Sequence, residues 1–126
     1  MIIGIGTDLC EIDRMKKLMQ DDRFLDRYFA DEEKVYIRDR GKVAAASMAG
    51  IFAAKEALVK ALGTGFINTE LKEICVLHDH LGKPYLDLRG QMAMHVSQMN
   101  ITDTHLSITH EGNMALAFVI AERNVY

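Results

Sequence analysis

Two acidic side chains and a lysine are the residues of this chain that could act together on a phosphate. Glu56 and Lys60 stand four residues apart in an alanine-rich segment, so a helix would place them on one face. Asp8 follows Gly4 and Gly6 on the same face of a possible strand, which leaves room beside its carboxylate. Mg²⁺ prefers carboxylate ligands, with substrate phosphate and water completing its shell. These residues therefore indicate a site for a metal-bound phosphate.

The same residues also have a structural explanation. An exposed Glu56–Lys60 pair would stabilise a helix by about 0.3–0.5 kcal/mol, with Lys60 well placed near the helix C-terminus. Gly4 and Gly6 would equally suit another backbone segment that packs closely against the strand. Both interpretations are open on these residues alone.

Hydrophobic periodicity predicts the elements that would hold these side chains. The predicted strands cover residues 2–10, 71–77, 84–88, 104–109 and 114–121, and the predicted helices cover residues 11–20, 31–38, 43–62 and 90–99. Asp31 is expected to be the N-cap of the second helix, and Gly63 to end the third in a left-handed conformation. The order β-α-α-α-β-β-α-β-β predicts an α+β fold: an antiparallel sheet with helices packed on one face, and a long central helix.

Composition restricts the class of protein. The 126 residues are 49% hydrophobic, which predicts one domain over residues 1–126. A net charge of -3 argues against a general nucleic-acid binder. We expect a cytoplasmic protein that does not enter a membrane, because we find no signal peptide and no run of about 18 apolar residues. Cys10 and Cys75 belong to no paired motif, so a disulfide framework is not expected.

Three other motifs fail when their spacing is checked. The glycine pair at residues 4 and 6 lacks the third glycine of a dinucleotide-binding fingerprint, since Leu9 stands there. The segment 110–114 has methionine where a zinc metalloprotease helix needs its second histidine. His78 and His80 could chelate a metal from one strand end, but a solvated hairpin tip explains them without a metal.

Four segments together resemble the holo-acyl-carrier-protein synthase family of 4'-phosphopantetheinyl transferases. They are GIGTDLCEIDR at residues 4–14, FAAKEALVKALGTG at 52–65, GKP at 82–84 and SITH at 107–110. The resemblance implies an enzyme that moves 4'-phosphopantetheine from coenzyme A to a serine of apo acyl carrier protein and releases adenosine 3',5'-bisphosphate. It also implies a role in fatty acid biosynthesis and a homotrimer whose active sites lie between subunits.

The resemblance also implies roles for individual positions. Asp8 and Glu56 match the Mg²⁺-binding carboxylates, and with Lys60 they would form the catalytic group. The positions that match coenzyme A contacts are Lys60, Gly63, Thr64, Gly65, Lys83, Pro84, His105, Ser107, Thr109 and His110, those from Lys83 onward in segments contributed by the neighbouring subunit. The positions that match the carrier-protein surface are Arg14, Leu18, Arg23, Phe24 and Arg27. Residues 11–28 contain five basic and five acidic side chains, so a basic patch there requires that the charges lie on different faces.

One position departs from the family pattern. Members commonly carry an arginine directly before the Phe-Ala-x-Lys-Glu segment, where it helps to neutralise a coenzyme A phosphate, and this chain has Ile51. The substitution removes a charge-assisted contact. Two rival hypotheses remain: another Mg²⁺-dependent nucleotide or phosphate transferase, and a trimeric protein that binds coenzyme A or carrier protein without turnover. Asp8, Glu56 and a metal-ordered water are the candidate bases for the serine.

Overall fold

The structure is a computed structural model that describes residues 1–65 and 68–125. Its strands are β1 (Ile2–Glu11), β2 (Ile74–His78), β3 (Pro84–Leu88), β4 (Asp103–Glu111) and β5 (Met114–Glu122). Its helices are α1 (Ile12–Leu18), α2 (Asp22–Tyr28), α3 (Asp31–Arg38), α4 (Ala44–Leu62) and α5 (Gly90–Gln98), with short 3-10 turns at Gly41–Val43 and Leu71–Glu73. The predicted α+β class and the order of the predicted elements are confirmed, and α2 is added to them.

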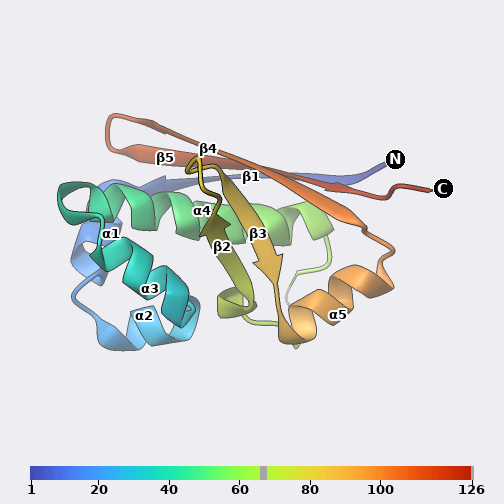
Figure 1. Cartoon of the computed structure of the whole chain (residues 1–126), viewed down its shortest axis with the longest axis horizontal. Coiled ribbons are helices and arrows are strands. Elements are labelled where there is room, and N and C mark those ends of the chain that lie inside the picture. The colour runs from blue at the N-terminus through green and yellow to red at the C-terminus, as the bar shows by residue number, and fades with distance from the viewer. Residues whose placement is uncertain (66–67, 126) are drawn as a thin grey trace.

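The strands form two antiparallel sheets. Strands β1, β5 and β4 make a three-stranded sheet with β5 in the centre, while β2 and β3 pair separately. Helix α4 runs beneath the larger sheet, and α1 to α3, the β2–β3 hairpin and α5 lie on the other side of α4 (Figure 1). The central helix is therefore a middle layer between a sheet and the remaining elements.

The middle position of α4 explains its composition. The helix is buried around most of its circumference, and small alanines let both neighbouring layers approach its axis. A Cβ atom added at Gly4 would lie 1.8 Å from the Ala61 carbonyl oxygen, and one added at Gly6 would lie 1.9 Å from that of Ala57. The two glycines of β1 thus let the strand pack closely against the backbone of α4, and they do not leave open space beside it. Gly63 ends the helix with φ +71°, as predicted. Among the described residues, no helix has the length and apolar character needed to cross a membrane.

The start of α3 differs from the prediction. Its N-cap is Ala30, and Asp31 is the first residue of the helix. The capping acceptor is Glu33, whose Oε1 accepts the Ala30 N–H at 2.9 Å. Asp31 instead lies exposed and pairs with Lys34 at 3.3 Å. Glu33 takes over the cap because its carboxylate is drawn inward by Lys55, whose Nζ lies 2.6 Å away in the core.

Candidate active site

Strand β1 and helix α4 bring the predicted acidic residues and the lysine together. The close packing at Gly4 and Gly6 sets β1 against α4, so the next residue on that face, Asp8, lies beside the last turns of the helix. Lys60 Nζ donates a hydrogen bond to Asp8 Oδ1 at 2.9 Å. The Asp8 side chain is 18% exposed and that of Lys60 57% exposed. Lys60 therefore pairs with Asp8 across two elements and not with Glu56 along the helix.

The electrostatics of this cluster suit a cation. Burial raises the pKa of Glu56, and the negative charge of Asp8 raises it further. The hydrogen bond to Asp8 raises the pKa of Lys60, which keeps that side chain charged. A divalent cation would offset the negative charges of these two neighbouring carboxylates, and Mg²⁺ prefers oxygen ligands of this kind. In the described part of the chain no cluster of three or more His, Cys, Asp or Glu side chains forms a complete metal cage. Asp8 and Glu56 would thus fit a Mg²⁺ whose other ligands are substrate and water.

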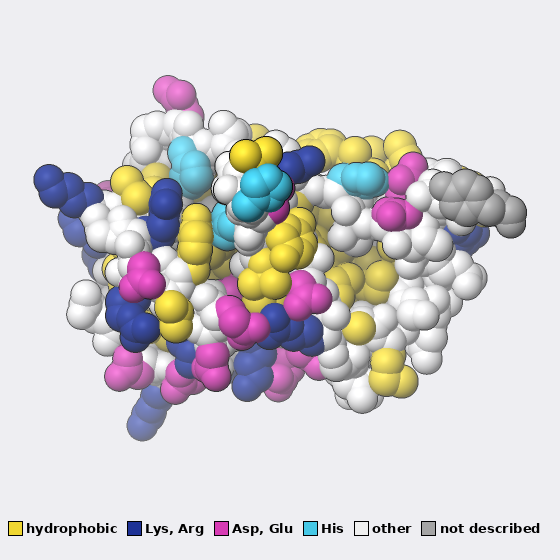
Figure 2. Space-filling view, in the orientation of Figure 1, with side chains coloured by type: hydrophobic (Ala, Val, Ile, Leu, Met, Phe, Trp, Pro, Cys, Tyr) yellow, Lys and Arg dark blue, Asp and Glu magenta, His cyan; other side chains and the backbone are white. Residues whose placement is uncertain are grey.

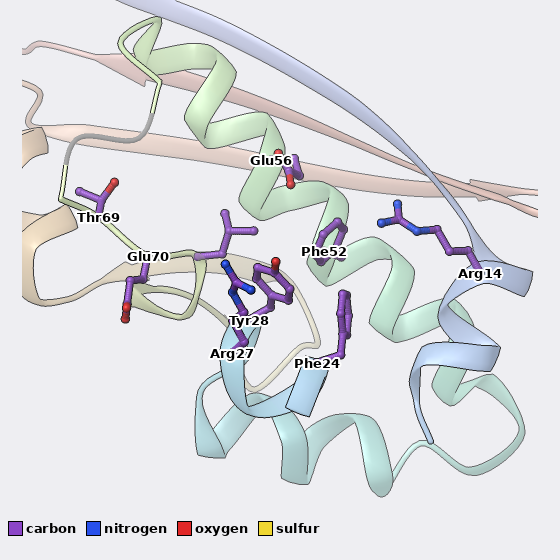
Figure 3. Close-up of a pocket in the computed structure, with 9 residues that line it drawn as sticks. Arg14, Phe24, Arg27, Tyr28, Phe52, Glu56, Thr69 and Glu70 are labelled. Atoms are coloured by element: carbon purple, nitrogen blue, oxygen red, sulfur yellow. The ribbon is translucent and has the colours of Figure 1, made fainter. Parts of the chain in front are cut away.

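A cavity of about 480 Å³ opens beside Glu56, and we call it the Glu56 cavity. Its lining comes from α1, α2, α4 and the segment that leads into β2: Arg14, Phe24, Arg27, Tyr28, Phe52, Glu56, Thr69, Glu70 and Leu71. Figure 3 shows the side chains of α1, α2 and α4 on one side, with Thr69 and Glu70 on the other. The rings of Phe24 and Phe52, 5.8 Å apart, form an apolar wall next to the Glu56 carboxylate.

Three of the five predicted carrier-protein residues line this cavity. The Arg14 guanidinium lies 5.6 Å from the centre of the Phe52 ring, and that of Arg27 lies 5.3 Å from the centre of the Tyr28 ring. Phe24 lies between them on α2, while Leu18 packs partly buried against the core and Arg23 is outside the lining. Figure 2 shows basic and acidic side chains intermingled over the region of α2 and α3. The positive charge at the cavity therefore comes from two arginines and not from a wide basic surface.

The predicted coenzyme A residues divide between two faces of the molecule. Pro84 and His110 line a second cavity, of about 190 Å³, which we call the hairpin cavity. Its other lining residues are Tyr36, Arg40, Ser47, Gly50, Ile51, His78, Gly82 and Ile108. Lys83 lies in the adjoining turn, where its N–H donates to Asp79 Oδ1 at 2.9 Å.

His105, Ser107 and Thr109 lie on the outer face of the larger sheet. Their partners across β4 and β5 are Ile120, Phe118 and Leu116, so the six side chains share one face. Phe118 is 39% exposed there, while Ala117 and Val119 on the opposite face are fully buried. The sheet separates these three polar residues from α4. They therefore cannot join Asp8, Glu56 and Lys60 in one site within a single copy of the chain.

The predicted glycine loop begins at Gly63, three residues after Lys60. Gly63 and Gly65 both have positive φ, +71° and +69°, which confirms that this turn needs glycine. Thr64 Oγ1 lies 2.8 Å from His95 Nε2 on α5, a contact that ties the loop to a distant helix. Within the described residues, none of the three lines either cavity.

Sequence reasoning missed several residues of the Glu56 cavity. Tyr28 went unnoticed because the seven-residue helix α2 is too short to show a clear period, although Phe24 and Tyr28 have the i, i+4 spacing of one helical face. Thr69 and Glu70 lie between elements, where no periodic signal exists. Arg40 and Tyr36 of the hairpin cavity were likewise not predicted, because only the folded chain brings them to His110.

Comparison with known proteins identifies the family. The model of the 4'-phosphopantetheinyl transferase superfamily matches residues 4–119. The chain belongs to this superfamily. The transferase is 43% identical over 122 residues to the holo-[acyl-carrier-protein] synthase of Treponema denticola, which covers 97% of this chain and 99% of the relative.

Solved structures agree with this assignment. The holo-[acyl-carrier-protein] synthase of Neisseria meningitidis matches with a TM-score of 0.88 and 35% identity, covering 98% of the transferase and 100% of that chain. The Bacillus anthracis synthase, solved in complex with CoA (3',5'-ADP), matches with a TM-score of 0.80 and 34% identity, covering 98% and 99%. The predicted resemblance to this family is confirmed, and with it the fold and the phosphopantetheinyl transferase class of the enzyme.

Proposed function

We propose that this transferase moves 4'-phosphopantetheine from coenzyme A to a serine of apo acyl carrier protein in a Mg²⁺-dependent reaction, in the cytoplasm and in support of fatty acid biosynthesis. The observation that supports this most is the Asp8–Lys60 pair beside Glu56, at the edge of a cavity that two arginines flank. A relative at 34% identity was solved with CoA (3',5'-ADP), which supports coenzyme A as the donor.

The proposed reaction is a displacement at the phosphorus that bears pantetheine. The serine oxygen forms a bond to this phosphorus as the bond to the second phosphate breaks, and the electron pair leaves with adenosine 3',5'-bisphosphate. The serine proton passes to a base, for which Asp8, Glu56 and an ordered water remain the candidates. Magnesium held by Asp8 and Glu56 would neutralise charge on the diphosphate.

The chain's own groups prepare this step. Lys60, which Asp8 holds by a hydrogen bond, presents a positive charge to the phosphate oxygens. Glu56 is partly buried in surroundings that are less polar than water, so its charge acts more strongly on a nearby ion than it would in water. The apolar wall of Phe24 and Phe52 suits the pantetheine arm and excludes water from the reacting serine.

The carrier protein would dock at the mouth of the Glu56 cavity. Arg14 projects from α1 and Arg27 from α2, on either side of Phe24 (Figure 3). No carboxylate lies within 4 Å of either guanidinium in the described residues. Both are therefore available to an acidic partner surface.

We further propose a homotrimer with active sites between subunits. On the outer face of the larger sheet Ile5 is 54% exposed, Leu9 61% and Phe118 39%. Leu9 lies opposite Leu116, and Thr7 opposite Phe118, so these side chains form one apolar surface across β1 and β5. His105, Ser107 and Thr109 lie next to it on β4, where a second copy could use them.

The direct test is incubation with coenzyme A, Mg²⁺ and apo acyl carrier protein, followed by intact mass measurement. We expect the carrier to gain the mass of one phosphopantetheinyl group. Asp8→Ala and Glu56→Ala should each abolish this gain while the circular dichroism spectrum stays native, because water replaces a lost carboxylate ligand poorly. Glu111→Ala, which removes an exposed carboxylate at the end of β4, is the matched control.

The same experiment separates the proposed function from both rival functions, because only the proposed function adds mass to the carrier. A binding protein without turnover would retain coenzyme A and leave the carrier mass unchanged. Another nucleotide or phosphate transferase would also leave the carrier unchanged, and would act on a different acceptor. Near-normal transfer by either carboxylate variant at saturating Mg²⁺ would refute the assigned roles of Asp8 and Glu56.

A further inference from the structure

Helix α5 contributes a histidine to the loop that follows α4. We propose that His95 is a positioning residue of the transferase: its ring N–H donates to Thr64 Oγ1 and leaves the Thr64 hydroxyl hydrogen free to bind a phosphate oxygen of coenzyme A. This inference rests on the proposed function and deepens it, since it adds a residue that acts on the substrate through another side chain. His95 lies outside the four segments that resemble the family.

The loop at the end of α4 is open on its outer side. A Cβ added at Gly63 or at Gly65 would meet no atom within 4 Å, so neither position is crowded by another element. Both glycines have positive φ, which lets the chain turn sharply there. Among the described residues, residues 63–65 are hydrogen-bonded to an element other than α4 through Thr64 Oγ1 and His95 Nε2, which are 2.8 Å apart. The position of the Thr64 hydroxyl therefore depends on His95.

Helix α5 is a firm support for His95. At its start, Glu73 Oε2 accepts an N–H of the first turn at 2.8 Å. At its end, the Arg123 side chain donates to the carbonyl oxygens of the two residues that follow the helix, at 3.0 and 3.1 Å. Its inner face contains Met92 and Val96, which are 1% and 6% exposed. None of these contacts involves the loop after α4, so α5 is positioned independently of that loop.

The chemistry of the hydroxyl decides which atom must donate. A threonine hydroxyl has one hydrogen to donate and two lone pairs that accept. If His95 Nε2 accepted that hydrogen, Thr64 would present only lone pairs to a phosphate, and a phosphate oxygen repels them. If Nε2 carries a hydrogen, His95 donates to Oγ1 and the hydroxyl hydrogen points elsewhere. In the structure the hydroxyl donates to the Gly65 carbonyl oxygen at 3.4 Å, a long contact that an anion would readily replace.

A phosphate bound at this loop would lie close to the lysine of the catalytic group. Lys60 is in the last turn of α4, four residues before Thr64, and its side chain is 57% exposed. Neither residue is among the described residues that line the Glu56 cavity or the hairpin cavity. The phosphates would therefore lie on the open surface at the end of α4, where an oriented hydroxyl adds a directional donor to the point charge of the lysine.

Calorimetry of coenzyme A binding in the presence of Mg²⁺, applied to a double-mutant cycle, tests this role. Thr64→Val should weaken binding by about ten- to hundred-fold, because a hydrogen bond to a charged oxygen is lost. His95→Leu should weaken it by about two- to ten-fold, because the hydroxyl loses its orientation. In the Thr64→Val background, His95→Leu should have no further effect, since His95 acts through the hydroxyl.

Three further measurements distinguish positioning from a purely structural role. His95→Gln should restore most of the affinity, because glutamine can place a side-chain N–H near the position of Nε2. In steady-state transfer, His95→Leu should raise KM for coenzyme A and leave KM for the carrier protein unchanged. The ¹⁵N signal of His95 Nε2 should be that of a protonated ring nitrogen in the coenzyme A complex. Gln98→Leu, which changes an exposed polar side chain on the same helix, is the matched control and should bind coenzyme A like the wild type.

The possible outcomes separate this role from the proposed function. An unprotonated Nε2 in the complex would overturn the role of His95, and so would wild-type affinity in His95→Leu. An equal effect of His95→Leu with and without the Thr64 hydroxyl would show that His95 does not act through it. In these three cases the proposed function stands. If the wild type binds no coenzyme A, the proposed function itself fails and the role of His95 falls with it.

Discussion

At the scale of single residues, Glu56 offers a measurable test of the site. Its pKa is raised first by burial and then by the charge of Asp8, because both disfavour the ionised form. We expect Glu56 in the metal-free enzyme to titrate above an ordinary glutamate, and Asp8→Asn to lower its pKa. Carboxyl ¹³C chemical shifts followed against pH would measure both values. As the pH falls through the raised pKa of Glu56, protons compete with Mg²⁺, so the apparent Mg²⁺ affinity should weaken at a higher pH than for an ordinary carboxylate.

The comparison for this titration is Glu111→Gln, which changes an exposed carboxylate away from the cluster and should leave Glu56 unaffected. An unchanged Glu56 titration in Asp8→Asn would show that the two carboxylates do not share a site.

The sequence was sufficient to predict which residues form the candidate site, but it did not predict which of their side chains contact each other. The spacing of Glu56 and Lys60 predicts one helical face, yet the structure pairs Lys60 with Asp8, which is 52 positions away. Periodicity describes neighbours within an element, whereas this contact depends on how β1 packs against α4. The hairpin cavity could not be predicted for the same reason, because Tyr36, His78 and His110 meet Arg40 only in the folded chain.

At the scale of elements, a buried ion pair joins the layers around α4. Lys55 Nζ donates to Glu33 Oε1 at 2.6 Å, to the Leu71 carbonyl at 3.0 Å and to the Ile74 carbonyl at 2.6 Å. Glu33 Oε2 accepts the Val76 N–H at 2.9 Å. The pair thus ties α3 and α4 to β2 and to Leu71, which lines the Glu56 cavity. Sequence periodicity gave no sign of it, because a lysine and a glutamate normally predict solvent-facing positions.

We expect Lys55→Met to reduce the free energy of unfolding by about 3–5 kcal/mol, since it leaves Glu33 buried without a cation. Lys34→Met breaks the exposed pair with Asp26 and should cost at most about 1 kcal/mol. Urea unfolding of both variants would measure the difference. A loss in Lys55→Met no larger than in Lys34→Met would mean that the buried pair does not hold the layers together.

The pH dependence of the Lys55→Met variant follows from the same burial. Burial raises the pKa of Glu33 even with Lys55 present, so without Lys55 the folded state favours the protonated acid still more. A folded-state pKa above the unfolded value means that the folded state binds more protons, and stability then rises as the pH falls. The loss of unfolding free energy caused by Lys55→Met should therefore become smaller as the pH falls from the raised pKa of Glu33 to the pKa of a glutamate in the unfolded chain.

Element boundaries show where local patterns were sufficient. The predicted strand 84–88 and the predicted helix 43–62 agree closely with β3 and α4, because proline, glycine and long apolar periods mark their ends. The division of the strands between two sheets was not predicted. Hairpin signals show which consecutive strands pair, but β1 pairs with β5 at the far end of the chain, and only tertiary packing decides that choice.

At the scale of the whole molecule, the proposed carrier surface can be separated from the coenzyme A site. Charge reversal in Arg27→Glu should raise KM for apo carrier protein several-fold and leave KM for coenzyme A nearly unchanged, because Arg27 flanks the cavity mouth. Added salt should weaken the wild-type interaction with the carrier. Arg123→Glu changes the charge equally at the opposite end of the molecule and is the control. An effect of Arg27→Glu confined to coenzyme A would place this arginine at the nucleotide.

The proposed trimer is indicated, in a single copy of the chain, only by the apolar side chains that remain exposed. Leu9 and Phe118 lie on the outer face of the larger sheet, 61% and 39% exposed, so burial in a trimer would contribute only part of the about 1.5–3 kcal/mol that full burial of such a side chain gives. Leu9→Glu and Phe118→Glu should convert the enzyme to monomers in light scattering and abolish transfer, since the hairpin cavity of one copy would no longer reach the cluster of another. Leu81→Glu changes a side chain that is 82% exposed at the hairpin tip and should preserve assembly and activity. A monomeric Leu9→Glu variant with full transfer activity would refute sites shared between subunits, and an intact trimer in both variants would place the interface on another face.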